Sequence, residues 1–404
     1  MSSDYDIVII GGGLSGGSLA LALQDTGYSV AVVEAVTDEQ RHSSPAARRA
    51  LALSYGTVNL LRSLGIWEGV AEKSSAIRDI HVSDRGHFAK ARLSAEKEGV
   101  DALGYVITAG VLEDHISDIL ESSPIERICP ARLMGFSAGP ESVYLTLRRG
   151  EEDLTPVTRL LVGADGVQSS VRRFLNIGLE TRDYRQTAIV TVIRPEVDPL
   201  GMAFERFTST GPLAVLPMVD GCCSVVWTQA EEEAERIMAL DDQKFRTRLQ
   251  DAFGFRLGKL ELESVRVQFP LELVRAETMI GPRSVLVGNA AHQLHPVAGQ
   301  GFNLGIRDIA LLAEMIIDDA GQCRDPGAPR LIEAYAEARR TDHEAVIRFT
   351  DGVVRVFSND WLPAVGARGL GLLFLDHCSM AKHWLTRHAM GLGGRVPRIG
   401  SRPE

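Results

Sequence analysis

Runs of consecutive apolar residues at the start of the chain predict strands that are buried on both faces. Residues 5–10 (YDIVII) and 29–34 (SVAVVE) both show this pattern, which is typical of strands in a parallel sheet. Between them, residues 14–26 carry small and apolar side chains that predict a helix packed closely on the sheet. A strand, a helix and a second strand with short links form a βαβ unit, so the sequence begins as an α/β fold.

A different pattern occupies the middle of the chain. Between residues 183 and 275, short apolar runs separated by turns predict an antiparallel sheet, and residues 77–95 predict a hairpin. Elsewhere the pattern predicts helices over residues 56–75, 110–122, 301–320, 329–357 and 361–390, and strands over residues 143–148, 158–162 and 284–288. We therefore predict a discontinuous Rossmann-like α/β domain (1–76, 100–182 and 276–345), an inserted antiparallel β-sheet domain (77–99 and 183–275), and a C-terminal helical segment with a tail (346–404).

Composition excludes several classes of protein. The 404 residues carry a net charge of −10, from 43 basic and 53 acidic side chains, without the basic stripe of a nucleic-acid-binding protein. The five cysteines are odd in number and include no C-x-x-C pair, which argues against a disulfide framework and a structural zinc site. The first residues show no targeting signal, and no apolar run approaches the roughly 18 residues of a membrane-spanning helix. We expect a reduced, cytoplasmic setting and no nucleic-acid partner.

A glycine-rich segment, Gly11-Gly12-Gly13-Leu14-Ser15-Gly16, stands between the first strand and the first helix. This G-x-G-x-x-G spacing permits a tight turn at Gly11, close approach of a pyrophosphate at Gly13, and close helix packing at Gly16. Free N–H groups at the helix start favour the phosphate charge. Glu34 ends the second strand, 18 residues after Gly16, where its carboxylate can accept ribose hydroxyls. The segment therefore predicts an adenine dinucleotide site; the alternative is a glycine-rich turn without a ligand.

Two later segments also follow predicted strands. Residues 163–172 (GADGVQSSVR) place Asp165 after a strand, where its carboxylate can equally serve as an ordinary helix cap. Residues 288–303 (GNAAHQLHPVAGQGFN) end where a helix starts near Gly301, with unpaired N–H groups and a positive dipole end. We interpret His292 and His295 there as loop histidines and predict no metal, because no carboxylate or thiol joins them at ligand spacing.

Together and in this order, the three segments resemble the single-component flavoprotein aromatic hydroxylases of the p-hydroxybenzoate hydroxylase type, over residues 5 to about 345. Asn289, where that family usually has Asp, is a departure shared by the ubiquinone-biosynthesis hydroxylases, as are ERFTSTGPLAVLPM (205–218) and HVSDRGHFAKARL (81–93). Within that group the sequence most resembles hydroxylases of a 2-polyprenyl-6-methoxyphenol. The resemblance implies bound FAD and these cofactor-binding residues: Gly11, Gly13, Ser15, Gly16, Glu34, Arg49 near the pyrophosphate, Asp165, Asn289, Pro296, Gly299, Gly301, Phe302 and Asn303.

The resemblance also implies a reaction. NAD(P)H visits transiently and reduces FAD, O₂ adds at the flavin C4a, and the hydroperoxide transfers OH to an electron-rich phenol ring. Water must be excluded from this chemistry. Apolar residues of the inserted sheet would cover the substrate, or else simply pack the sheet: Phe204, Leu216, Pro217 and Trp227. The sequence identifies no phenol-activating base; His81, His87 and His295 are candidates by residue type, and His295 and Pro296 are expected near the flavin.

Three functions stay open at this point. The first is an FAD monooxygenase that acts on a prenylated phenol, the second is a hydroxylase of a small soluble aromatic acid, and the third is an FAD-binding subunit of a biosynthetic complex without turnover. The apolar segment 361–375 either contacts a membrane or a partner, or packs as a core helix. The expected partners are the prenylated phenol and, through that segment, the surface of the inner membrane or other ubiquinone-biosynthesis proteins.

Overall fold

The computed structural model describes residues 3–84, 90–208, 210–294, 299–320, 325–357, 378–393 and 397–398 of the chain. Its first sheet is built around five parallel strands in the order β8 (Glu126–Ile128), β2 (Val30–Val33), β1 (Tyr5–Ile10), β12 (Val157–Gly163) and β20 (Ser284–Leu286). Strand β1 lies at the centre, with Ile7 and Ile9 in one hydrophobic core and Val8 and Ile10 in another. The uninterrupted apolar run of the sequence therefore reflects burial on both faces.

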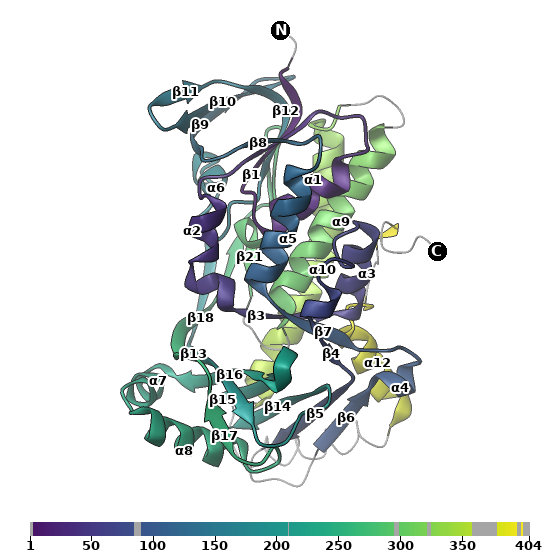
Figure 1. The fold of residues 1–404 in the computed structure, drawn as a ribbon. Helices are drawn as coiled ribbons and strands as arrows, with labels where there is room; N and C mark the ends of the chain where they lie inside the picture. Colours follow the sequence, from purple (N-terminus) through teal and green to yellow (C-terminus); the bar gives the residue numbers. More distant parts are fainter. Residues whose placement is uncertain are drawn as a thin grey trace.

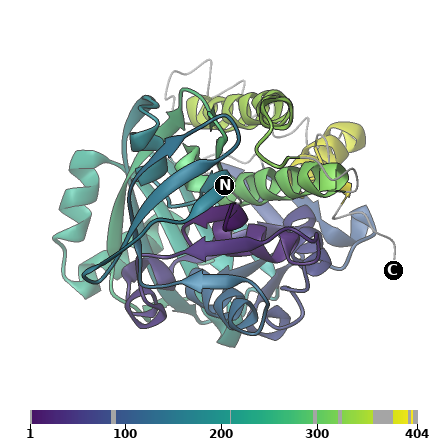
Figure 2. The same cartoon turned by 90° about the horizontal axis from the view of Figure 1, so that it is seen from above.

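Helices cover one face of this sheet and a β-meander covers the other (Figure 1). The helical layer consists of α1 (Leu14–Leu23), α3 (Tyr55–Ser63), α5 (Ala109–Glu121), α9 (Gln300–Ala320) and α10 (Pro329–Phe357). Seen from above, α9 and α10 lie side by side, in light green (Figure 2). The opposite face packs against β9 (Arg132–Ala138), β10 (Val143–Arg149), β11 (Glu152–Leu154) and α6 (Ser170–Phe174).

The second large sheet lies at the lower end of the molecule in Figure 1. Its strand order is β21-β18-β13-β16-β15-β14-β5-β6, and β17 also pairs with β13. The bounds are β5 (Asp79–Asp84), β6 (Lys90–Ser94), β13 (Leu179–Pro195), β14 (Met202–Thr208), β15 (Gly211–Pro217), β16 (Cys223–Ala230), β17 (Leu260–Leu262), β18 (Val267–Ala276) and β21 (His292–Gln293). The predicted hairpin is the antiparallel pair β5–β6, but β5 joins the sheet by pairing with β14 in parallel, so the sheet is not purely antiparallel.

Two helices that the sequence analysis missed cover the outer face of this second sheet. Helices α7 (Glu231–Met238) and α8 (Asp242–Phe253) bury Ile237, Phe245 and Leu249 against the strands. The expectation of strands alone between residues 183 and 275 was therefore wrong. The helix predicted over residues 56–75 is also too long, because α3 ends at Ser63 and Gly65 then adopts a φ of +69°, which stops a helix.

A small sheet connects the two large ones. Its strands, β3 (Ala50–Ser54), β7 (Gly104–Thr108) and β4 (Ser75–Ile77), pair in that order and are antiparallel. The remaining elements are short: α2 (Asp38–His42), α4 (Ala95–Glu98), α12 (Ser379–Ala389), β19 (Ile280–Gly281) and the 3₁₀ turns η1 (Pro45–Arg48), η2 (Ala71–Lys73), η3 (Val219–Gly221) and η4 (Gly288–Ala290). The predicted fold class, a Rossmann-like α/β unit with an inserted β-sheet, is confirmed, while the exact domain boundaries stay a prediction.

Candidate functional site

The glycine turn between β1 and α1 has the geometry of a phosphate-binding loop. Gly11 has a φ of +103°, and a Cβ atom there would lie 2.5 Å from the carbonyl oxygen of Ala164. A Cβ atom on Gly16 would lie 1.8 Å from the Gly11 carbonyl oxygen, so the helix can pack this closely only with glycine. A Cβ atom on Gly13 would meet nothing within 4 Å. The loop is therefore tight on the protein side and open where a pyrophosphate would lie.

Glu34 stands at the end of β2 beside this turn. One carboxylate oxygen accepts a hydrogen bond from the Gly12 N–H at 2.7 Å, and the other accepts from the Val36 N–H at 2.9 Å. An ionised carboxylate offers about four acceptor positions, so Glu34 can still accept ribose hydroxyls. The predicted carboxylate thus lies in contact with the predicted glycine loop.

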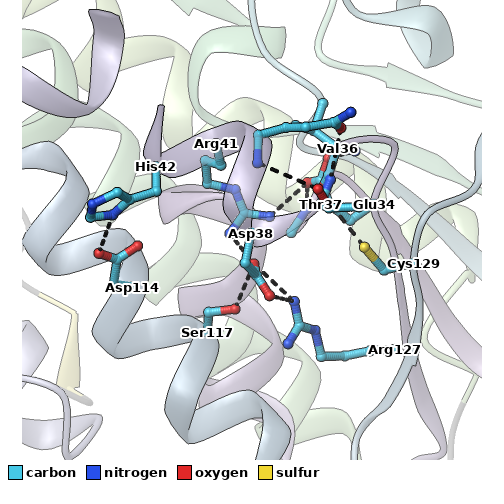
Figure 3. Close-up of polar contacts among 12 residues, drawn as sticks. Glu34, Val36, Thr37, Asp38, Arg41, His42, Asp114, Ser117, Arg127 and Cys129 are labelled. Carbon is cyan, nitrogen blue, oxygen red and sulfur yellow. Dashed lines mark hydrogen bonds and ion pairs between the residues drawn. The ribbon is translucent and has the colours of Figure 1, made fainter. Parts of the chain in front are cut away.

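Helix α2 brings Arg41 to Glu34 (Figure 3). The Arg41 guanidinium lies 3.7 Å from the Glu34 carboxylate and 3.1 Å from Asp38, and its buried Nη2 makes no hydrogen bond within the described residues. Asp38 in turn accepts hydrogen bonds from Ser117 at 2.9 Å and from Arg127 at 3.1 Å, which hold α2 against α5 and β8. The sequence analysis did not select Arg41; a basic residue seven positions after the ribose-binding acid was the available signal.

Asp165 lies directly behind the glycine loop. Its Oδ2 accepts hydrogen bonds from the Ser170 N–H and hydroxyl, both at 2.6 Å, and from the Val171 N–H at 3.3 Å. The carboxylate therefore does hold the start of α6, as the helix-cap interpretation proposed. Its Oδ1, however, is buried and has no hydrogen-bond partner among the described residues. Buried acceptors normally have a partner, so this oxygen is available for a ligand hydroxyl.

The third predicted segment meets the first two at the end of β20. Arg172 of α6 donates a hydrogen bond from Nη1 to the Ala290 carbonyl oxygen at 2.9 Å. A Cβ atom on Gly288 would lie 2.4 Å from the Ser15 hydroxyl, so these two segments pack as closely as glycine allows. Asn289, next in the chain, is exposed. Segments that are more than a hundred residues apart therefore converge around one edge of the parallel sheet, at the carboxyl ends of its strands, where α/β folds bind ligands.

Asn303 fixes the start of α9 to the small sheet. Its Oδ1 accepts hydrogen bonds from the Ser54 N–H at 2.9 Å and the Thr57 hydroxyl at 2.7 Å. Its Nδ2 donates to the Ala52 carbonyl oxygen at 2.9 Å and to the Gly299 carbonyl oxygen at 2.7 Å. These four bonds use the amide fully. The Asn303 side chain thus supports the start of α9, and its contact with FAD stays a prediction.

The remaining predicted cofactor residues are distributed around this helix start. Phe302 is partly buried against the main core, whereas a Cβ atom on Gly301 would meet nothing within 4 Å. The Arg49 side chain is exposed. Desolvation by nearby protein atoms lowers the pKa of its guanidinium, and the Glu113 carboxylate opposes that shift. Pro296 and His295 lie outside the described residues.

A buried polar network lies behind the start of α9. Asp308 of α9 contacts His292 Nε2 of β21 at 2.7 Å, His343 Nε2 of α10 at 2.7 Å and Arg339 Nε of α10 at 2.6 Å. Burial alone would raise the pKa of Asp308, but His343, Arg339 and His292 together hold that pKa well below its usual range.

The same network is a potential cation site that the sequence analysis did not foresee. Ligand atoms of His292, Asp308 and His343 lie within 4.8 Å of one another. Arg339 already supplies a positive charge to Asp308, so the cluster is a charge-balanced support for β21, α9 and α10. A carboxylate does join His292, but it belongs to Asp308, which lies 16 residues further along the chain and therefore outside local ligand spacing.

The predicted substrate residues are divided between the two faces of the second sheet. Leu216 packs with Ala203, Ile77 and Val106, on the face toward the small sheet. Phe204 and Trp227 lie in the opposite cluster, against Phe253 and Phe245 of α8 at ring distances of 5.4 Å and 6.1 Å. Pro217 is buried and pairs with Cys223 of that opposite cluster. The alternative of plain sheet packing therefore describes Phe204 and Trp227 better than a role at the substrate.

The face toward the small sheet is apolar and partly accessible. Its half-buried side chains, which alternate with the residues of the outer cluster, are Val190, Val192, Ala214, Leu216 and Val226. Glu205 of β14 lies on the same face. His81 faces the other way, with its ring 6.0 Å from Phe204, and burial together with nearby arginines lowers its pKa to about 4. His87 lies outside the described residues.

These features fit FAD, which the glycine loop, Glu34, the free Oδ1 of Asp165 and the open start of α9 would hold. Comparison with protein families supports this fit, since the model described as FAD binding domain matches residues 4–350. The chain belongs to this family.

Relatives within the FAD-binding family narrow the group. Ubiquinone hydroxylase UbiL of Rhodospirillum rubrum is 37% identical over 403 residues, which cover 98% of this chain and 92% of that protein. The 3-demethoxyubiquinol 3-hydroxylase of Escherichia coli is 29% identical and covers 96% of this chain and 98% of its own. The mitochondrial ubiquinone biosynthesis monooxygenase COQ6 of Homo sapiens is 29% identical, with 95% and 92% covered. The predicted resemblance is confirmed, and the chain is an FAD-dependent aromatic monooxygenase of the ubiquinone-hydroxylase group.

Solved structures show the same fold. The p-nitrophenol 4-monooxygenase PnpA of Pseudomonas putida superimposes with a TM-score of 0.80 at 17% identity and covers 98% of this chain and 100% of its own. Pseudomonas aeruginosa PqsL, solved with 2-aminobenzoylacetate, gives a TM-score of 0.75 at 22% identity, with 91% and 99% covered. Among the described helices, none is both long and apolar enough to cross a membrane.

Proposed function

We propose that this protein hydroxylates the aromatic ring of a polyprenylated methoxyphenol in ubiquinone biosynthesis and consumes NAD(P)H and O₂. The glycine loop, Glu34, Asp165 and the start of α9 together form what we call the FAD cradle. The observation that carries the proposal is this cradle together with the apolar, partly accessible sheet face that lies toward it. Relatives that match nearly the whole chain are named as ubiquinone hydroxylases, which supports the pathway. An apolar binding face suits a substrate with a prenyl tail.

When bound, FAD supplies the capacity to take electrons from NAD(P)H and to activate O₂. The chain's own residues position it. Glu34 would accept the ribose hydroxyls, the N–H groups around Gly13 would hold the pyrophosphate, and Asp165 would accept a hydroxyl through its free Oδ1. Arg49, which is exposed beside the small sheet, would pair with a phosphate. The sheet face carrying Leu216 would exclude water from the ring that reacts.

A hydroxylase of a small soluble aromatic acid is the second candidate. Such a substrate calls for an arginine or lysine to pair with its carboxylate. On the described part of the sheet face toward the FAD cradle, the half-buried residues around Leu216 are aliphatic, and Glu205 and Asp84 are carboxylates. The arginine that alternation places on this face, Arg194, is exposed and already pairs with Glu263. The face thus favours a neutral phenol over an acid.

Purified protein loaded with FAD tests the proposal. NADH and NADPH oxidation would be measured with a short-tailed 2-methoxyphenol, with 4-hydroxybenzoate, and without substrate. We expect the methoxyphenol alone to stimulate oxidation and to yield a hydroxylated product. Stimulation by 4-hydroxybenzoate instead would favour the soluble substrate. If FAD binds but neither compound stimulates NAD(P)H oxidation, the protein would be a subunit without turnover, the alternative that Asn289 in place of the family's Asp suggests.

A peripheral contact with the inner membrane is part of the proposal. Segment 361–375 lies outside the described residues, but helix α12 follows it and presents two exposed apolar side chains, Met380 at 81% and Trp384 at 56% accessibility. The other side of α12 packs through Leu385 against the cluster of Leu93 and Leu103. An exposed Trp on a helix next to an apolar segment suits the interface of a bilayer.

A further inference from the structure

Strand β14 carries one carboxylate on the sheet face that looks toward the FAD cradle. Ala203 of β14 packs against Ile77 and Val106 of the small sheet, which identifies this face. Side chains two residues apart on a strand share a face, so Glu205 lies on the same side. Phe204, between them, packs in the outer cluster with α8.

The surroundings of Glu205 are almost entirely apolar. Its register partners are Val82 on β5 and Ala214 on β15, both half-buried, and Glu205 itself is half-buried. Asp84 of β5 lies on the same face, where it pairs with Phe207. Arg194 of β13 and its register partner Glu261 of β17 also alternate onto this face and are exposed. Arg206 follows Glu205 on β14 and therefore points to the outer face. Desolvation raises the pKa of Glu205 to about 7, and no neighbouring charge contributes to the shift.

Strand β3 connects this face to the start of α9. Ala50 of β3 packs against the cluster that contains Ala203 and Leu216. Ala52, two residues further on, accepts the Asn303 hydrogen bond through its carbonyl oxygen, and its Cβ would lie 3.0 Å from a Cβ on Gly299. A planar ring bound between the start of α9 and the second large sheet would therefore face the part of that sheet that carries Glu205.

We propose that Glu205 is the catalytic base that accepts the proton of the substrate's phenol hydroxyl. In this step the phenol O–H bond breaks, its electron pair stays on the phenol oxygen, and the proton forms an O–H bond with a Glu205 carboxylate oxygen. The resulting phenolate is more electron-rich and reacts faster with an electrophilic oxygen. This inference rests on the proposed function, because it requires a phenol as the substrate.

The accessible and desolvated carboxyl group suits this role better than the histidines of the sequence analysis. An ordinary carboxylate is a weak base toward a phenol, whose pKa is about 10. A carboxyl whose pKa lies near neutrality is a stronger base and is still ionised in a large fraction of molecules at neutral pH. His81 has its ring on the outer face, against Phe204.

The first test is the pH profile of kcat for three proteins with a short-tailed methoxyphenol: wild type, Glu205→Gln and Glu235→Gln. Glu235 is an exposed residue of α7, so its variant is the matched control. We expect wild type and control to lose activity as pH falls through about 7, because Glu205 becomes protonated there. Glu205→Gln should lose roughly 10²–10⁴-fold at neutral pH and recover toward pH ~10, where the phenol ionises by itself. Glu205→Asp should restore part of the rate and also the acid limb of the profile, that is, the loss of activity as pH falls.

The second test needs no turnover. The dissociation constants of the methoxyphenol and of its O-methyl ether would be measured from the absorbance change of bound FAD across the same pH range. We expect wild type to bind the phenol more tightly above pH 7 than below, and the ether equally at all pH values. Glu205→Gln should lose this difference for the phenol and bind the ether as wild type does.

The outcomes separate the two proposals. If wild type hydroxylates but Glu205→Gln keeps its rate within about twofold and keeps the acid limb, Glu205 is not the base while the proposed function stands. If wild type does not hydroxylate, the proposed function fails. In that case a phenol-specific pH limb in binding that Glu205→Gln abolishes still supports Glu205 as the phenol's acceptor, and an unchanged limb overturns it.

Discussion

At the scale of single residues, the contact between Glu34 and the Gly12 N–H fixes the nucleotide-binding turn. Replacing Glu34 by Gln keeps an acceptor for Gly12 but removes the negative charge that strengthens hydrogen bonds from ribose hydroxyls. A hydrogen bond to a charged group contributes about 1.5–3 kcal/mol. We expect Glu34→Gln to weaken FAD binding by about 10-fold to 100-fold, measured by the quenching of flavin fluorescence on titration.

Glu39→Gln provides the matched control for that experiment. Glu39 is exposed on α2, close in sequence to Glu34, and the substitution makes the same change of charge. FAD affinity should stay within about twofold of wild type. An equal loss in both variants would mean that general electrostatics, and not contact with the ribose, explains the effect of Glu34.

Residues with local signatures were predictable from the sequence. Gly11 and Gly16 are required by a positive φ and by a close helix contact, both of which depend on neighbours in the same turn. Glu34 follows at a spacing set by one βαβ unit. Glu205 was not predicted, because its importance depends on which face of β14 meets the small sheet. A glutamate between Ala203 and Phe207, the apolar residues at the neighbouring inward positions of β14, was the local sign.

At the scale of elements, the Asp308 network holds β21, α9 and α10 together. Removing one partner of a buried charged network leaves the others without compensation, at a cost of about 3–5 kcal/mol. We expect Asp308→Asn to lower the free energy of unfolding by about 3 kcal/mol in urea titrations. The control Glu337→Gln breaks an exposed pair with Arg340 on α10 and should cost less than about 1 kcal/mol.

The same variant has a defined pH dependence. The folded-state pKa of Asp308 lies below its unfolded value of about 4, so its contribution to stability is present above that pH and is lost as pH falls through the folded pKa. The stability difference between wild type and Asp308→Asn should therefore narrow on acidification below about pH 4. A difference that stays constant to the lowest pH at which both fold would contradict this account.

The sequence predicted a helix or strand correctly where one hydrophobic pattern extended over the whole element. The helix predicted over residues 329–357 is α10 itself, and the strands around residues 5–10 and 158–162 are β1 and β12. The sequence analysis did not predict helices α7 and α8 because strand patterns lie on both sides of them. The helical spacing of Phe245, Leu249 and Phe253 was the available signal for α8. The Asp308 network could not be predicted, since its members are brought together only by the packing of α10 on α9.

At the scale of the whole molecule, the exposed side of α12 provides a test of membrane contact. Each fully buried large apolar side chain contributes about 1.5–3 kcal/mol. We expect Trp384→Ala to reduce cosedimentation with phospholipid vesicles by about tenfold or more. Phe255→Ala, which removes a side chain that is 70% exposed beside α8, is the control and should leave vesicle binding unchanged. Equal binding by Trp384→Ala and wild type would place the membrane contact elsewhere.

The two large sheets and the small sheet between them form the frame of the proposed reaction, with the FAD cradle on one side and the apolar face with Glu205 on the other. The central claim is that oxygen from O₂ enters the ring of a prenylated methoxyphenol bound there. Mass spectrometry of the product formed under ¹⁸O₂, with FAD-loaded protein, NAD(P)H and a short-tailed methoxyphenol, tests it most directly. We predict a ring-hydroxylated product that carries one ¹⁸O atom per molecule. NAD(P)H oxidation that yields only hydrogen peroxide and unchanged phenol, with substrate demonstrably bound, would contradict it.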